Sequence, residues 1–106
     1  MKDWKIEELT GYKPKTTFYL DFSIAEAFGI SAVCDTYTKA LKEWLSNIEY
    51  VTELSMALNW KIWEHYETNQ QLGKLYNDLW FKCCDEITRH YADNEEALSY
   101  FYTTTD

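Results

Sequence analysis

Apolar side chains recur along this 106-residue chain at the three- and four-residue spacing of α-helices. The longest such run, residues 48–67, has one broad apolar face and a second apolar strip nearly opposite it. The broad face consists of Tyr50, Val51, Leu54, Ala57, Leu58, Ile62 and Tyr66, and the second strip of Met56, Trp60 and Trp63. We therefore expect a central helix, ending near Thr68, that neighbouring elements cover on two sides.

The polar residues of the same run separate into two edges. The acidic edge consists of Glu49, Glu53, Glu64 and Glu67, and the other edge of Thr52 and Asn59. This distribution favours a water-exposed helix edge over a membrane span.

Two further runs are apolar on one side only and predict amphipathic helices on either side of the central one. The first runs from Ser31, a candidate N-cap, to about Asn47, and the second from about Gln71 to Tyr91. The stripe of the first is Val33, Tyr37, Ala40, Leu41, Trp44, Leu45 and Ile48; that of the second is Leu72, Leu75, Tyr76, Leu79, Trp80, Cys83, Ile87 and His90.

Capping-box spacing predicts two shorter helices. In one, Ser23 and Glu26 open a helix that ends at Gly29. In the other, Asp93 and Glu96 open a helix that continues through Phe101. Each box places a side-chain oxygen within reach of the unpaired N–H groups of the first helical turn.

The predicted fold is all-α: a single-domain irregular helical bundle of three main helices plus two short ones, over residues 23–106. Residues 1–22 contain Gly11 and Pro14 and are predicted to form an irregular N-terminal strap packed on the bundle. The stretch TTFYLDF has strand propensity, but the chain offers no second strand to pair with it. One domain is therefore expected overall.

Charge and cysteine content narrow the classes of partner and compartment. The chain has 18 acidic against 10 basic residues, a net charge of −8, which argues against binding nucleic acid or an anionic membrane and favours a basic partner surface. An odd number of cysteines, Cys34 and the adjacent Cys83 and Cys84, is typical of reduced thiols. With no visible signal peptide and no apolar run of membrane length, a cytoplasmic protein is expected.

The sequence contains few residues that suggest a metal site or a catalytic site. His65 and His90 lie near the middle of apolar helical faces, and Cys83 shares a face with His90, but no paired motif of metal ligands is present. Cys83 and Cys84 lie inside a helix without a neighbouring base, so core packing explains them better than catalysis. We expect no enzyme activity, no cofactor and no metal.

Aromatic residues exceed what a minimal core needs, at 18% of the chain. Exposed Trp and Tyr are common anchors of protein interfaces. The candidate protein-binding residues are Trp60 and Trp63 on the second strip of the central helix and Tyr102 near the end of the chain.

The opening MKDWKIEELTGYKPKTTFYLDFSIAEAFG, the central LNWKIWEHYE and the closing LSYFYTTTD span nearly the whole chain. Together they resemble a family of small accessory proteins encoded on conjugative transposons and related mobile genetic elements of Gram-positive gut bacteria. The resemblance implies a cytosolic accessory protein of an integrated element. The family supplies no established activity and no site residues.

These observations lead to three hypotheses of function. The first is a non-enzymatic accessory protein of a mobile genetic element that binds another protein, with a homodimer through the aromatic strip as one form of that binding. The second is a helix-turn-helix DNA-binding protein using Ser23–Leu41, although Asp35 stands where such motifs keep a buried apolar residue. The third is an acidic inhibitor whose carboxylates mimic nucleic acid.

Overall fold

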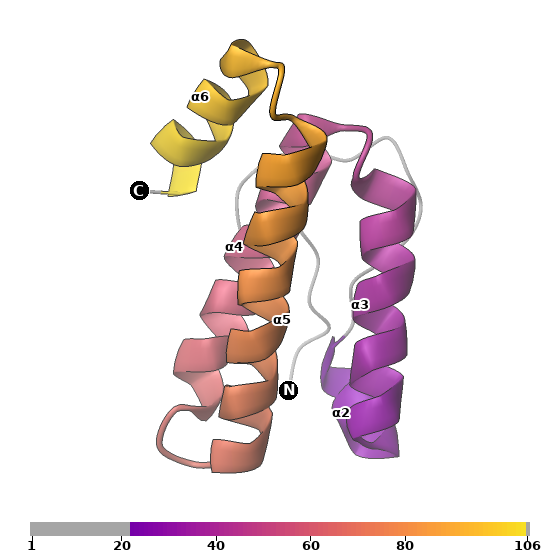
Figure 1. Cartoon of the computed structure of the whole chain (residues 1–106). Helices are drawn as coiled ribbons and strands as arrows, with labels where there is room; N and C mark the ends of the chain where they lie inside the picture. Colours follow the sequence, from indigo (N-terminus) through magenta and orange to yellow (C-terminus); the bar gives the residue numbers. More distant parts are fainter. Residues whose placement is uncertain (1–21, 106) are drawn as a thin grey trace.

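A computed structural model describes residues 22–105, which form five α-helices and no strand (Figure 1). The helices are α2 (Phe22–Phe28), α3 (Ile30–Trp44), α4 (Ile48–His65), α5 (Gln70–His90) and α6 (Glu95–Thr105). The all-α prediction is confirmed for this part of the chain. The predicted N-terminal strap lies outside the described residues, apart from Phe22, which begins α2 and is fully buried.

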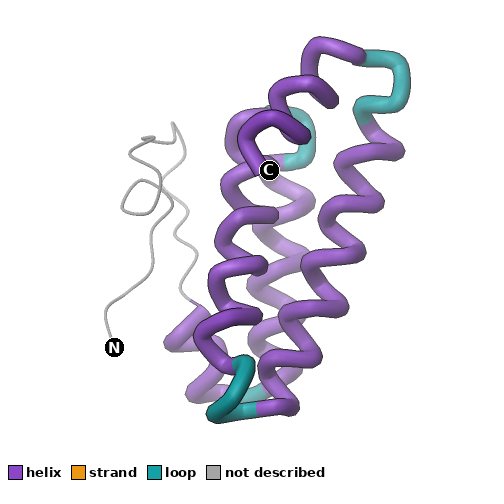
Figure 2. Tube along the Cα trace, turned by 90° about the vertical axis from the view of Figure 1, so that its left-hand side faces the viewer, coloured by secondary structure: helices purple, strands orange, loops and turns teal. Residues whose placement is uncertain are grey.

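The helices pack around an antiparallel pair, α4 and α5, which run side by side in both views (Figures 1 and 2). Helix α3 packs beside this pair, α2 packs on the lower half of α3, and α6 packs against α4. The buried face of α4 supplies much of the core, including Val51, Leu54 and Leu58. The predicted role of residues 48–67 as the central helix is confirmed.

Three asparagines fix where the later helices begin. The side-chain oxygen of Asn47 accepts from the backbone N–H groups of Glu49 and Tyr50, at 3.0 and 3.2 Å. Asn69 caps α5 and Asn94 caps α6 in the same way, each through one backbone N–H. These bonds satisfy amides that have no partner within the helix.

Three of the predicted caps are wrong. Ser31 lies within α3, whose N-cap is Gly29 and which has no side-chain cap, and Asn94 rather than Asp93 caps α6. Ser23 likewise lies within α2, because that helix already includes Phe22. Capping spacing located the helix starts to within one or two residues but did not select the residue that makes the bond.

The outer faces of α4 also differ from the predicted pattern. Glu53 and Thr52, expected on polar edges, are buried, with Glu53 only 4% exposed. Tyr100 of α6 lies close enough to Glu49 and Glu53 for their charges to raise its pKa, after the larger effect of its own burial. Helix α6 therefore covers the first half of the outer surface of α4. Tyr66, expected on the buried face, is exposed at the end of the helix.

Gly29 is expected to tolerate no other residue without a loss of stability. It alone separates α2 from α3 and has φ +119° and ψ 179°, a region that residues with a Cβ rarely adopt. We expect Gly29→Ala to lower the free energy of unfolding by about 1–3 kcal/mol. Urea unfolding measures this, with Ser31→Ala as the control at an exposed position two residues on. A Gly29→Ala variant as stable as the control would contradict the argument from backbone strain.

Candidate functional site

Exposed aromatic side chains border a groove formed by α4, α5 and the end of α6. Trp60 and Trp63 are 57% and 69% exposed, and the half-buried Trp80 of α5 stands beside them. The groove has a volume of about 250 Å³ and is lined by Ser55, Met56, Asn59, Trp60, Trp63, Trp80, Thr104 and Thr105. The structure therefore brings together two of the three predicted protein-binding residues.

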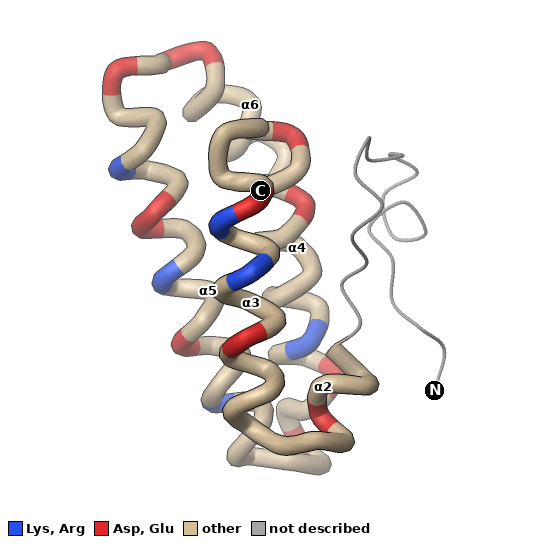
Figure 3. Tube along the Cα trace, turned by 90° about the vertical axis from the view of Figure 1, so that its right-hand side faces the viewer, with Lys and Arg blue, Asp and Glu red and all other residues tan. Residues whose placement is uncertain are grey.

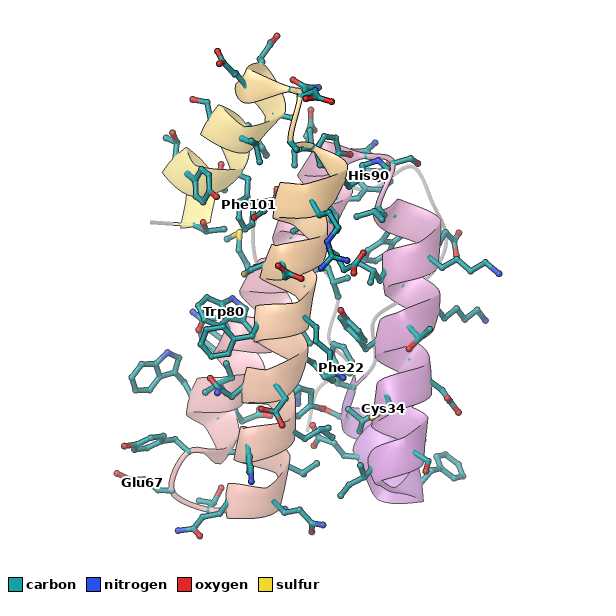
Figure 4. All side chains as sticks on the ribbon, in the orientation of Figure 1. Phe22, Cys34, Glu67, Trp80, His90 and Phe101 are labelled. Atoms are coloured by element: carbon teal, nitrogen blue, oxygen red, sulfur yellow. The ribbon has the colours of Figure 1, made fainter. Side chains whose placement is uncertain are left out.

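The aromatic surface extends past this groove in two directions. The ring of Tyr66 lies 5.8 Å from that of Trp63, and the exposed ring of Phe81 lies 5.0 Å from that of Trp80. Tyr66 also borders a second, larger groove of about 720 Å³ near the α4–α5 turn, lined by Ile62, Tyr66, Glu67, Gln70, Gly73, Lys74 and Asn77. Figure 4 shows Trp80 and Glu67 on the same side of the molecule. We call Trp60, Trp63, Tyr66, Trp80 and Phe81 the aromatic face.

Tyr102, the third predicted binding residue, is 48% exposed but does not line either groove. It lies on α6 with its ring 5.3 Å from that of the buried Phe101. The aromatic face thus consists of residues from α4 and α5, with α6 contributing two threonines to the edge of the groove.

A second candidate site is a buried ionic cluster that joins α2, α4 and α5. Lys61, only 2% exposed, lies 3.2 Å from Oε2 of Glu26 and 2.5 Å from Oε2 of Glu64. Its ammonium also donates to the hydroxyl of Ser23 at 3.4 Å. The hydroxyl of Tyr76 donates to Glu26 at 2.5 Å, so a single carboxylate receives bonds from two other helices.

His65 completes this cluster. Its Nε2 lies 3.1 Å from Oε2 of Glu26 and 3.3 Å from Oε2 of Glu64, and its ring stacks on that of Tyr76 at 5.7 Å. Because an ionised carboxylate only accepts hydrogen bonds, Nε2 is the nitrogen that carries the hydrogen. His65, predicted near the middle of an apolar helical face, is 8% exposed.

The surroundings of the cluster shift two of its pKa values in opposite directions. Burial acts to raise the pKa of Glu26, but hydrogen bonds from Tyr76 and His65 and the charge of Lys61 outweigh it, so the pKa is lowered. Burial, together with the adjacent Glu26 carboxylate, raises the pKa of Tyr76 far above its usual range. The stable arrangement is therefore a charged Glu26 and a neutral Tyr76.

Three of these side chains have atoms of the kind that bind metal ions. Glu26, Glu64 and His65 each offer one ligand atom, and the three atoms lie within 4.8 Å of one another. The ammonium of Lys61, however, already lies between the two carboxylates. A divalent cation would bind here only if Lys61 left that position, so the geometry favours a structural ion cluster over a metal centre.

The lowered pKa of Glu26 predicts a loss of stability in acid. Because the unfolded chain takes up a proton near pH 4.3 and the folded protein only below that, the unfolded state binds more protons in this window. The contribution of Glu26 is present above about pH 4.3 and is lost as the pH falls through its folded pKa. Urea unfolding at a series of pH values should show a smaller acid-induced loss for Glu26→Gln than for the wild type.

Glu96→Gln is the control for this measurement, because Glu96 is exposed on α6. It should reproduce the wild-type slope of stability against pH. Equal slopes for the wild type and Glu26→Gln would contradict the assignment of the acid sensitivity to the cluster.

The remaining candidate groups from the sequence are Cys83, Cys84 and His90, all on α5. Cys83 is fully buried, as predicted, and burial raises its pKa and that of Cys84, which disfavours the reactive thiolate. Cys84 lies 3.6 Å from the hydroxyl of Ser55. His90, predicted on an apolar face, is instead exposed at the end of α5 (Figure 4), although Ile87 in the same turn is fully buried.

The α2–α3 pair gives the helix-turn-helix alternative little support. Only Gly29 separates the two helices, whereas the turn of that motif usually has three or four residues. On α3, Ser31, Asp35, Thr38 and Lys39 are exposed, and none is the arginine or the amide side chain that most often reads base edges. Figure 3 shows acidic and basic positions interspersed along α3 rather than a basic face.

The sequence analysis missed the buried cluster. Capping-box spacing places Glu26 at the start of a helix and the acidic edge of residues 48–67 places Glu64 in solvent, so neither residue predicts a buried ion pair. The only available signal was the helical spacing, which places Lys61 on the same face of the helix as the apolar residues Leu54, Ala57 and Leu58. Pairing across α2, α4 and α5 depends on tertiary contacts.

Comparison with known proteins shows no matching family model, no similar curated protein and no similar solved structure. Within residues 22–105, none of the helices is long and apolar enough to cross a membrane.

Proposed function

We propose that this chain is a non-enzymatic accessory protein of a mobile genetic element, built as an irregular bundle of three main and two short helices, that acts by binding another protein. The observation that carries the binding proposal is the aromatic face. Its assignment to a mobile element rests on the sequence resemblance alone.

Two physical features support protein binding at the aromatic face. Trp60 and Trp63 expose large apolar rings to water, and covering such rings is favourable because it removes apolar surface from the solvent. The same residues border a groove, so a partner side chain can contact several rings at once. Tryptophan at the centre of an interface is among the residues whose loss weakens binding most.

Affinity capture tests this proposal. The tagged wild-type protein and a Trp60→Ala/Trp63→Ala variant are used to capture proteins from nuclease-treated extracts of the native host, with quantitative mass spectrometry. We expect a protein that the wild type retains and whose recovery falls at least about tenfold with the double variant. Because both tryptophans are exposed, circular dichroism and the melting temperature of the double variant should stay near those of the wild type.

Phe28→Ala is the matched control. Phe28 is more exposed than either tryptophan, at 81%, but lies at the end of α2 and lines neither groove. It should capture the same protein as the wild type. If the double variant and the control capture the same proteins in the same amounts, binding through the aromatic face is wrong.

The helix-turn-helix alternative is tested with the same material, by binding to duplex DNA at increasing salt. A phosphate-dependent DNA binder would bind at low salt and release as the salt concentration rises. No feature of α3 favours this alternative, and we expect no binding.

A further inference from the structure

The groove between the tryptophans has a chemical character that narrows the class of partner. Its lining combines aromatic rings with the hydroxyl and amide side chains of Ser55, Asn59, Thr104 and Thr105, and contains no charged residue. The hydroxyl of Ser55 is buried beside Cys84 and that of Thr105 donates to the carbonyl of Phe101, whereas the amide of Asn59 is exposed. A partner side chain that is planar and carries hydrogen-bond donors can contact both the rings and this amide.

The electrostatic surroundings of the groove are negative. Helix α6 ends at Thr105, and its last two residues line the groove, so the carbonyl end of an eleven-residue helix, which carries the negative pole of the helix dipole, lies at its edge. Glu49, in the first turn of α4, and Glu67, just after the end of that helix, are both exposed. Among the residues that line the two grooves, the one basic residue is Lys74, which lines the neighbouring groove together with Glu67.

The charge of the whole chain acts in the same direction. Acidic residues exceed basic ones by eight, and acidic positions recur along the helices (Figure 3). This net charge repels a second copy of the chain and attracts a cationic partner over a distance of about 10 Å at moderate salt.

From this complementarity we infer that the occupant of the groove is an arginine-containing, extended segment of a partner protein, whose guanidinium group stacks on the tryptophans. The inference rests on the proposed function and specifies the partner class. A guanidinium is planar, stacks on the faces of aromatic rings and carries five donors, for which the amide oxygen of Asn59 and the last carbonyls of α6 are acceptors. A lysine ammonium lacks the planar surface and is expected to bind more weakly.

The test is calorimetric titration of the full-length protein with a short peptide that alternates arginine and glycine. The matched peptide replaces each arginine by citrulline, which keeps the planar shape but removes the charge. We expect the arginine peptide to bind, with an affinity that falls as salt rises, and the citrulline peptide to bind at least about tenfold more weakly. Trp60→Ala/Trp63→Ala should lose at least about tenfold in affinity, and Phe28→Ala should match the wild type.

Three results would overturn the inference. Equal binding of the citrulline peptide would show that charge plays no part. Equal binding of the arginine peptide to the double variant would place it on dispersed carboxylates, as expected for an acidic inhibitor that mimics nucleic acid. A dimer, seen by analytical ultracentrifugation of the wild type and lost in the double variant, would make a second copy the occupant.

The peptide titration and the affinity capture together separate a failure of the arginine inference from a failure of the proposed function. If the arginine peptide does not bind but the double variant still loses its captured protein, the inference about arginine is wrong and protein binding by the aromatic face stands.

Discussion

Replacing Lys61 by methionine is expected to lower the free energy of unfolding by about 3–5 kcal/mol, the usual effect of breaking a buried ion pair. Methionine keeps most of the volume and flexibility of the side chain but removes the charge. The carboxylates of Glu26 and Glu64, which lie 3.2 and 2.5 Å from the ammonium, would then remain partly buried without their cation. Since small domains have total stabilities of about 5–15 kcal/mol, such a loss is large. Urea unfolding followed by circular dichroism measures it.

Two further variants distinguish the loss of charge from the loss of packing. Lys82→Met makes the same substitution at an exposed position of α5 and should change the stability by less than about 0.5 kcal/mol. The triple variant Lys61→Met/Glu26→Gln/Glu64→Gln removes the lysine and both of its carboxylate partners and should be more stable than Lys61→Met alone. If Lys61→Met were no more destabilising than Lys82→Met, the buried cluster would not stabilise the fold.

Trp44→Ala is expected to destabilise the protein by about 3–5 kcal/mol, the range for removing a large aromatic side chain from a core. Trp44 is 1% exposed at the end of α3, and its ring meets that of Tyr50 edge to face, with centroids 6.0 Å apart. Its removal leaves a cavity between α3 and α4 that neighbouring side chains fill only in part. Thermal and urea unfolding both report the change.

The chain contains its own control for this experiment. Trp60→Ala removes the same side chain from an exposed position and should change the stability by less than about 0.5 kcal/mol, while it weakens binding under the proposed function. The two substitutions therefore separate a tryptophan that holds the fold from one that is available to a partner. Similar destabilisation by both would show that Trp60 also packs in the core.

Periodicity was a reliable guide where a helix has one apolar face. Val33, Tyr37, Ala40 and Trp44 of α3 are buried as predicted, because their spacing leaves only one orientation that removes apolar surface from water. The predicted face of α5 is also buried at Tyr76, Leu79, Cys83 and Ile87. It fails at His90, which is exposed although Ile87 in the same turn is buried.

Periodicity was a poor guide where a helix has two apolar faces. The two apolar faces of α4 predicted that other helices pack on both of its sides. They did not predict how much of each face those helices bury. Helix α6 covers the outer side only in its first half, so Glu53 is buried and Trp60 and Trp63 are exposed. The spacing of residues within α4 does not decide between burial and exposure of Trp60 and Trp63, because that depends on packing against other helices.

The sequence by itself determined that the described chain is all helical, where the helices begin and end to within a few residues, and which stripe of α3 and α5 forms the core. These features follow from contacts between residues that are close in sequence. The tertiary structure alone decided that Lys61 meets Glu26, 35 positions earlier, and that the aromatic face lies open beside the last turn of α6. Such pairings depend on how helices distant in sequence pack, and the spacing of residues within one helix has no information about its neighbours.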